Sequence, residues 1–146
     1  MNPYRLVVKK DTKRKSGIPT GNAGEYFVMG ELLRRGFDAQ LADRNTKGYD
    51  MLVGSAGKQM IRVQVKTVRS QPWYARLESF KGKNRNQVTV YVLLGHLDGK
   101  NPVRYFIVKN RDVAKHFSQP SGWTRNGFMS MKAVEKFENC WKALRT

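Results

Sequence analysis

The sequence predicts a single α/β domain with a central mixed sheet flanked by helices. One helical pattern near the start is followed by several short strand patterns and then by further helical stretches, an order typical of helices packed on a sheet. A length of 146 residues fits one domain with a sizeable core. With 40% hydrophobic and 11% aromatic residues, the chain has enough apolar surface to fold without disulfides or a structural metal, which excludes a disordered tail.

Two elements are predicted in the first part of this domain. A helix is expected over Ala23–Arg35, because Thr20 can cap its start and Gly36 suits the left-handed position that follows a helix. Phe37–Leu41 then predicts a short strand. Together they give the helix-then-strand opening of the domain.

A β-hairpin is predicted next. Tyr49–Gly54 and Lys58–Val68 flank the short connection 55–57, which contains a glycine. The second of these strands alternates between apolar and polar residues, with Gln64 and Lys66 on its polar face. The hairpin is therefore expected to bury one face and to leave the other for solvent or a ligand.

The rest of the domain completes the sheet and its cover. Residues 69–87 are polar and basic and predict an irregular connection. Val88–Leu94 is apolar on both faces, which favours a central strand, and Val103–Lys109 predicts a strand paired with it. A short helix over Asp112–Phe117 and a last helix over Met131–Leu144 follow.

The charge of the chain points to a polyanionic partner. It has 28 Lys and Arg against 11 Asp and Glu, a net charge of +17 at pH 7, and such an excess is typical of proteins that neutralise phosphates. A membrane surface or a ribosome is the weaker alternative, because the cations are spread along the chain rather than gathered on one amphipathic helix. No apolar run approaches the roughly 18 residues of a membrane span, so we expect no membrane partner.

The ends of the chain and its cysteine content add two expectations. Residues 1–19 are rich in Lys and Arg and contain Pro3, Gly17 and Pro19, which predicts a basic N-terminal arm ahead of a folded domain over residues 20–146. A single cysteine, Cys140, excludes an internal disulfide network and is typical of a reducing compartment. With no secretory pattern at the start, a cytoplasmic location is expected.

Glu25 is the first residue that an ordinary core does not explain. It lies on the predicted helix stripe that also carries Val28 and Leu32. A buried carboxylate without a partner is costly, so Glu25 is expected to meet a cation, a metal or a water-filled cleft. The alternative is a half-exposed Glu in the first turn, where the helix dipole favours it.

The hairpin supplies the other candidate residues. If its strands pair, Asp50 falls opposite Gln64, Val65 and Lys66. The Asp50 carboxylate, the Gln64 amide oxygen and the Val65 carbonyl are the hard oxygen donors that Mg²⁺ prefers. Lys66 beside them would hold or deprotonate a water and neutralise charge on a phosphate. The alternative is a turn Asp and a solvated Lys on an edge strand.

The order and spacing of these residues resemble the PD-(D/E)xK nuclease superfamily, which includes restriction endonuclease-like and Holliday-junction-resolvase-like enzymes. The resemblance rests on residues 21–25 ending in Glu25, residues 45–50 ending in Asp50, and residues 63–67 around Gln64 and Lys66. It implies an αβββαβ core and a Mg²⁺-dependent DNA endonuclease of the homing, restriction or junction-resolving type, with Mn²⁺ as a second usable metal. In that family the helix Glu, the strand Asp and the (D/E)xK residues form the catalytic site.

Two departures from the family pattern stand out. Tyr49 takes the place of the proline before Asp50, and Gln64 takes the place of an acid, which makes this chain a QxK variant. A neutral Gln removes one formal negative charge, so metal binding is expected to be weaker. The alternatives left open are a catalytically weak or inactive nucleic-acid-binding module of the same fold, and an RNase.

Nucleic-acid contacts are expected from cations around this site and in the arm, with DNA favoured over RNA by the resemblance. Trp73 and Tyr74, in the basic connection, either pack under the sheet or stack on a base. One active site per chain predicts a homodimer or higher oligomer for cutting two strands. The candidate contacts are Lys13, Arg14, Lys15, Lys47, Arg62, Arg69, Trp73, Lys81, Lys83 and Arg85.

Overall fold

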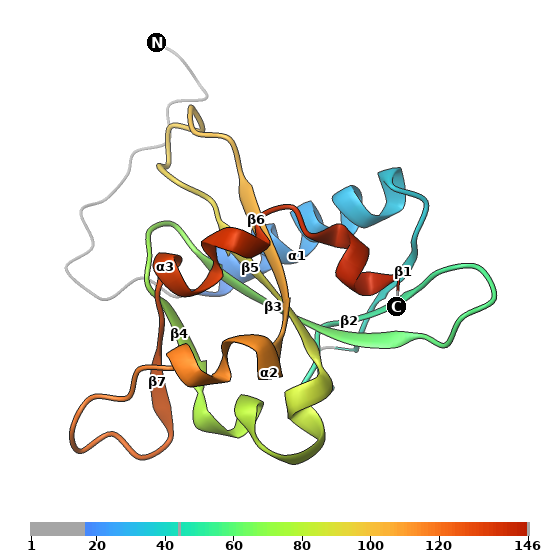
Figure 1. Cartoon of the computed structure of the whole chain (residues 1–146). Coiled ribbons are helices and arrows are strands. Elements are labelled where there is room, and N and C mark those ends of the chain that lie inside the picture. Colours follow the sequence, from blue (N-terminus) through green and yellow to red (C-terminus); the bar gives the residue numbers. More distant parts are fainter. Residues whose placement is uncertain (1–16, 44, 146) are drawn as a thin grey trace, which may run out of the picture.

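A computed structural model describes residues 17–43 and 45–145. Lys13, Arg14 and Lys15 of the predicted arm lie outside these residues. The polypeptide forms one α/β unit around a five-stranded sheet (Figure 1).

The central sheet has the strand order β1-β2-β3-β5-β6. The β3–β5 pair is parallel and the other pairs are antiparallel, which makes the sheet mixed, as predicted. The predicted hairpin is present as β2 and β3, and the strand predicted to be central is β5, buried along almost its whole length. The strands are β1 Asp38–Leu41, β2 Met51–Gly54, β3 Ile61–Val68, β5 Val88–Leu93 and β6 Arg104–Lys109.

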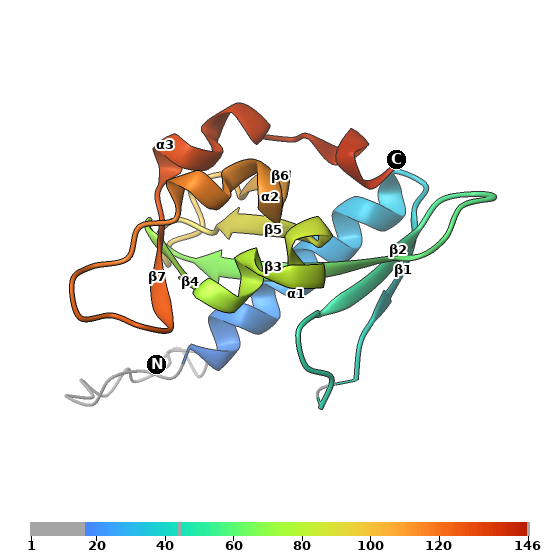
Figure 2. The same ribbon diagram turned by 60° about the horizontal axis from the view of Figure 1, so that its bottom comes forward.

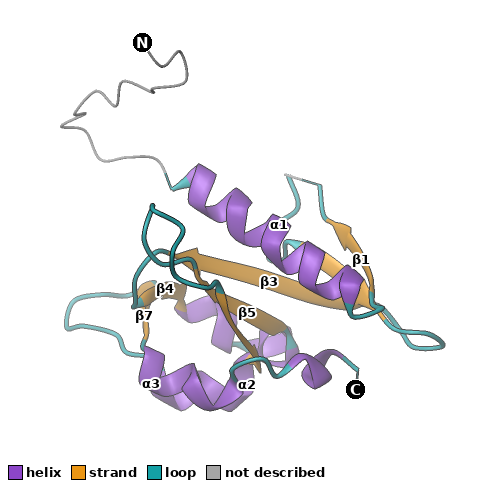
Figure 3. Cartoon of the chain, turned by 90° about the horizontal axis from the view of Figure 1, so that it is seen from above, coloured by secondary structure: helices purple, strands orange, loops and turns teal. Residues whose placement is uncertain are grey.

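Helix α1, Ile18–Arg34, covers one face of the sheet (Figure 3). It buries Val28 and Leu32 against the strands and ends before Gly36, which has the positive φ of 83° that its predicted role requires. It begins earlier than predicted, because Pro19 occupies its first turn, where the fixed φ of proline suits a helix. The end of the predicted arm is thus the start of α1.

The other face of the sheet is covered by a second layer. A two-stranded antiparallel sheet of β4, Trp73–Arg76, and β7, Asn126–Met129, packs there beside α2, Asn110–Val113. The prediction that residues 69–87 are irregular is therefore wrong for β4. Its alternation is confined to four residues, and its partner β7 comes from a glycine-containing loop far along the chain, so neither strand showed a clear pattern alone.

The rest of the connection between β3 and β5 consists of two 3₁₀ turns, η1 at Leu77–Phe80 and η2 at Gly82–Asn86. They stand at the position of the second helix of an αβββαβ core and complete the crossover that a parallel pair needs. The predicted short helix 112–117 is present as α2 followed by the 3₁₀ turn Ala114–His116. Figure 2 shows the loop before β7 projecting from the body beside β4.

The single last helix predicted over 131–144 is wrong. The segment is α3, Met131–Val134, and 3₁₀ turns, broken where Asn139 has a φ of 55°. Its apolar residues serve two different cores, since Val134 packs in the β4–β7 layer and Trp141 packs on the α1 side. Glu138 ties the break to the edge of the sheet through two 2.8 Å bonds from Arg104.

Candidate active site

Asp50 lies where β2 begins, beside the middle of β3. Its backbone N–H donates to the Val63 carbonyl at 2.9 Å, which continues the β2–β3 ladder by one residue. Its carboxylate then accepts a 2.8 Å hydrogen bond from the Val65 N–H. The Asp50 side chain therefore accepts the hydrogen bond that the backbone of a longer β2 would have accepted from β3. Asp50 and Val65, predicted to lie opposite each other, are in direct contact.

The Val65 carbonyl lies on the same side of β3 as this hydrogen bond. In a strand, the N–H and C=O of one residue point to the same neighbouring strand, so both groups of Val65 face Asp50. The side chains of Gln64 and Lys66 alternate with the buried Val63 and Val65 and point to the opposite face from α1.

These donors fit a hard divalent cation. Asp50 offers a carboxylate with one oxygen committed to Val65, while Gln64 and Val65 offer neutral oxygens. In the described residues there is no group of three or more His, Cys, Asp or Glu placed to hold a metal. Such a group is not expected here, because Gln64 stands where the family pattern has an acid, and backbone, water or phosphate oxygens would complete the shell.

A cleft of about 700 Å³ opens over Gln64 and Lys66. One side is the loop before Asp50, which the Gln87 amide fixes by donating to the Gly48 carbonyl. The other side is built from the end of β4 and the two 3₁₀ turns. The lining residues are Lys47, Gly48, Gln64, Lys66, Arg76, Glu78, Ser79, Asn84 and Gln87.

The cleft perturbs Lys66. Burial of its ammonium group is the main cause that lowers the pKa of Lys66 below its usual value, and the nearby Arg76 lowers it further. The Asp50 carboxylate acts in the opposite direction and raises the pKa of Lys66. Because its pKa is lowered, Lys66 gives up its proton more readily than an exposed lysine, and the neutral amine can accept a proton from water.

Glu25 lies in a different position from the other predicted site residues. It is half-buried on α1, directly after Gly24, and a Cβ at Gly24 would overlap the Thr67 hydroxyl of β3. Helix α1 covers the sheet face of Val63 and Val65, whereas Lys66 points to the other face. Glu25 is thus held beside the candidate strand, and its role as a metal ligand stays a prediction.

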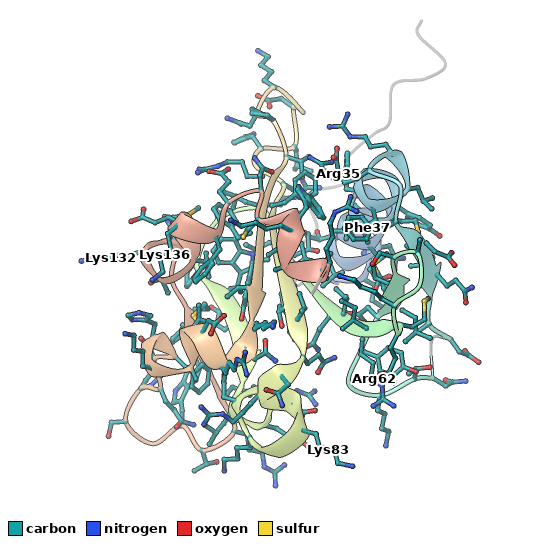
Figure 4. All side chains as sticks on the ribbon, turned by 45° about the vertical axis from the view of Figure 1, so that its right-hand side comes forward. Arg35, Phe37, Arg62, Lys83, Lys132 and Lys136 are labelled. Atoms are coloured by element: carbon teal, nitrogen blue, oxygen red, sulfur yellow. The ribbon has the colours of Figure 1, made fainter. Side chains whose placement is uncertain are left out.

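Four of the predicted nucleic-acid contacts line the cleft or the two grooves beside it. Lys47 lines the cleft, and Arg62 and Lys83 line a groove that continues from it past Lys47 and Asn84. Figure 4 shows Arg62 and Lys83 projecting from the same lower side of the molecule. Lys81 lines a second groove, which continues from the cleft past Arg76.

The remaining candidates within the described residues lie outside these grooves, two at the surface and one in the core. Arg85 is exposed on the same 3₁₀ turn as Lys83, and Arg69 is exposed beside the Gly95 carbonyl. Trp73 packs under the sheet, the first of its two predicted positions, so its ring is not presented at the surface as a nucleic-acid contact would require. It is fully buried, its Nε1–H donates to the Val92 carbonyl at 3.0 Å, and its ring packs edge-on against Tyr91.

Three residues that sequence reasoning missed shape the cleft. Arg76 and Glu78 line it from β4 and η1. Asn110 is fully buried and donates to the carbonyls of Ser79 and Asn84 at 3.0 and 2.8 Å, so it fixes the turns that form the wall. The alternation in Trp73-Tyr74-Ala75-Arg76 is the signal that could have revealed β4 and the orientation of Arg76.

Comparison with solved structures finds chains of similar fold. The Holliday junction resolvase Hjc of Archaeoglobus fulgidus superposes with a TM-score of 0.50 and 16% identity over 80% of this chain and 88% of its own. The bacterial homing endonuclease I-Ssp6803I superposes with a TM-score of 0.52 and 11% identity over 88% of this chain and 90% of its own. Both are PD-(D/E)xK-type nucleases.

The chain has the restriction endonuclease-like fold of these enzymes. The resemblance that the sequence predicts is confirmed at the level of the fold, together with the single mixed α/β domain. No known family pattern and no curated protein sequence matches the chain. Within residues 17–43 and 45–145, no helix is both long and apolar enough to cross a membrane.

Proposed function

We propose that this protein is a metal-dependent endonuclease that hydrolyses phosphodiester bonds of DNA. The observation that carries the proposal is the Asp50 carboxylate bound to the Val65 N–H, next to Gln64 and Lys66 in a cationic cleft. The fold shared with a junction resolvase and a homing endonuclease supports nuclease chemistry. The excess of 17 positive charges supports a polyanionic substrate.

Each site residue has a chemical role in this proposal. Asp50, Gln64 and the Val65 carbonyl would hold Mg²⁺ or Mn²⁺, with Glu25 as a further acidic ligand or as the group that orients water. When bound, the metal supplies Lewis-acid stabilisation of the phosphate and a more acidic water. Lys66, with its lowered pKa, accepts a proton from the attacking water or neutralises the charge that develops on the phosphate oxygens.

The cations around the cleft would position the DNA backbone. Lys47 lies at the cleft itself, Arg62 and Lys83 flank it on one side, and Lys81 flanks it on the other. Contacts of this kind fix the register of the duplex without reading its sequence. Cutting both strands would require two copies of the chain, and we expect the protein to act in the cytoplasm as a homodimer or higher oligomer.

A panel of substrates tests the activity and its type. Supercoiled plasmid, a synthetic four-way DNA junction and tRNA are incubated with the protein in Mg²⁺, in Mn²⁺ and in chelator. We expect cleavage of DNA that chelator abolishes, with Asp50→Ala at least about 100-fold slower than the unmodified protein. Preference for the junction indicates a resolvase, and a defined fragment ladder indicates a homing or restriction enzyme.

Lys132→Ala is the matched control, because Lys132 is an exposed cation on α3, away from Arg62 and Lys83 (Figure 4). Lys132→Ala should cleave DNA at the rate of the unmodified protein. Equal cleavage by Asp50→Ala would indicate a contaminant and contradict the proposal. Cleavage of tRNA alone would instead support an RNase.

Gln64 favours a second candidate, a binding module that has the nuclease fold without the chemistry. A neutral amide holds a divalent cation less well than a carboxylate, which lowers the expected activity. This candidate predicts tight DNA binding and no cleavage in either metal. Under the main proposal, Gln64→Glu should lower the Mg²⁺ concentration needed for half-maximal cleavage, because it restores a charged oxygen to the site.

A further inference from the structure

An exposed aromatic cluster lies beside a groove that adjoins the candidate active site, because Trp123 shares a hollow with residues 124–126 of that groove. Tyr74 and Phe128 are cross-strand partners in β4 and β7, with ring centroids 5.0 Å apart. Trp123, in the loop before β7, lies 4.9 Å from the Phe128 ring. Tyr74 is 59% exposed and Trp123 is 41% exposed, so two large ring surfaces face solvent.

The support beneath this cluster is well packed. Trp73 and Met129, the neighbours of Tyr74 and Phe128 along the two strands, are fully buried and oppose each other in the ladder. Phe128 exchanges two backbone hydrogen bonds with Ser118, at 2.7 and 2.9 Å. Tyr74 and Phe128 therefore stand on a fixed β surface, and the exposure of Tyr74 follows from the alternation of β4. Trp123 reaches this surface from the loop before β7.

The same β surface joins the cluster to the candidate active site. Arg76 lies two residues beyond Tyr74 on the exposed face of β4, about 7 Å along the strand. It lines both the cleft that contains Lys66 and the adjoining groove, which Lys81 and Arg125 also line. Residues 113–134, which contain Trp123 and β7, include no Asp or Glu. Among the described residues, Glu78 is the one acid that lines this groove, so a polyanion that lies along it meets three cations and one carboxylate beside the rings.

We infer that Tyr74, Phe128 and Trp123 form a stacking site for an unpaired nucleobase of the DNA strand that occupies the groove. The inference rests on the proposed function and specifies its substrate as DNA with unpaired bases. A base inside a duplex has both faces covered by its neighbours, whereas an unpaired base can place its face on an aromatic side chain. The phosphates of the same strand would lie against Arg76 and Arg125.

Binding measurements in chelator test this site without cleavage. Fluorescence anisotropy compares a blunt duplex with the same duplex carrying a single-stranded extension. Tyr74→Ala and Trp123→Ala should each weaken binding to the extended DNA by about 5- to 150-fold and leave blunt-duplex binding nearly unchanged. Tyr74→Phe and Trp123→Phe should retain most of the affinity because they keep a ring. Tyr26→Ala, which removes an exposed ring from α1, is the matched control and should bind both DNAs normally.

Tryptophan fluorescence gives a second, direct measurement. Of the three tryptophans, Trp73 and Trp141 are buried and Trp123 is the exposed one. Extended DNA should quench the emission of the unmodified protein and reduce its quenching by acrylamide, and Trp123→Phe should lose both effects.

Unchanged affinity for extended DNA in Tyr74→Ala and Trp123→Ala would overturn the stacking site, and so would equal losses on both DNAs. The proposed function would still stand in those cases if Asp50→Ala abolishes metal-dependent cleavage. Absence of any DNA binding by the unmodified protein would overturn both.

Discussion

Lys66 is the residue at which stability and the proposed chemistry conflict most clearly. Its ammonium group is partly buried between Asp50, which favours the charge, and Arg76, which disfavours it. Burial prevails, so the pKa of Lys66 is lower in the folded protein than in the unfolded chain. Keeping a charged lysine here costs folding free energy, as is common at functional sites.

Lys66→Met should therefore stabilise the protein, by about 1 kcal/mol at neutral pH. The destabilising effect of Lys66 is fully present below its lowered folded pKa, and it fades as the pH rises through that pKa. Urea denaturation at neutral and alkaline pH measures the free energy of unfolding. The gap between Lys66→Met and the unmodified protein should narrow at alkaline pH, and a less stable variant at neutral pH would contradict this account.

Arg76→Met should move the pH dependence of cleavage upward. The cation of Arg76 lowers the pKa of Lys66, so its removal raises that pKa. If neutral Lys66 acts as the base, the rise in rate with pH shifts to higher pH. If charged Lys66 is required instead, the rate falls when Lys66 loses its proton, and this fall also shifts to higher pH. Single-turnover rates across the alkaline range measure the shift, and an unchanged profile would show that the two residues are not coupled.

At the scale of the elements, the contact between α1 and β3 positions the candidate strand. Gly24 allows the helix to approach Thr67, the residue after Lys66, so closely that no side chain fits between them. Close helix–strand approach of this kind is a reason for a glycine in a helix interior, where it otherwise lowers stability. The position of Lys66 therefore depends on a residue on the opposite side of the sheet.

Gly24→Ala should lower the free energy of unfolding by about 1–3 kcal/mol, because the added methyl group forces α1 away from β3. Cleavage should fall with it. Gly30→Ala, in the same helix with open space around it, should instead raise stability by up to about 1 kcal/mol. Thermal denaturation of the two variants makes the comparison, and equal effects would show that the Gly24 contact has no special role.

The elements also show what could be predicted from the sequence and why. The period-two alternation around Gln64 and Lys66 predicted β3, and the run of apolar residues over Val88–Leu94 predicted a central strand, since both patterns reflect burial along one continuous segment. A hairpin pairs neighbouring segments, and this pairing alone predicts Asp50 opposite Val65. Local patterns are therefore sufficient to predict the part of the site that the β2–β3 hairpin supplies.

The parts that were predicted wrongly depend on distant contacts. The β4–β7 pair joins segments about fifty residues apart, so the burial of Trp73 and the exposure of Tyr74 follow from a partner that the local sequence does not show. The last helix is interrupted because Glu138 binds Arg104 on β6, a tertiary contact that overrides the helical pattern. Arg76 and Glu78 were missed for the same reason, since the crossover brings them to the cleft.

At the scale of the whole molecule, a strong positive charge surrounds a site with few acids. Of 11 Asp and Glu in the chain, Asp50 contacts the candidate strand directly and Glu78 lines the cleft, whereas cations line the cleft and both adjoining grooves. This charge layout attracts a phosphate backbone and leaves a carboxylate where a metal would be held.

DNA binding in chelator should therefore weaken steeply with salt. A plot of log affinity against log salt concentration should lose about one unit of slope in Lys83→Ala and in Arg62→Ala, since each removes one phosphate contact. Lys132→Ala should leave the slope nearly unchanged. A slope near zero for the unmodified protein, or equal changes in all three variants, would contradict a defined DNA track along these grooves.

The central claim is that the cleft with Asp50, Gln64 and Lys66 cuts DNA, and the single-turnover cleavage rate of Lys66→Met tests it most directly. This variant should be at least as stable as the unmodified protein, so a loss of activity cannot come from misfolding. We predict a rate at least about 100-fold lower, with Lys132→Met at the unmodified rate. Cleavage by Lys66→Met at the unmodified rate would contradict the account.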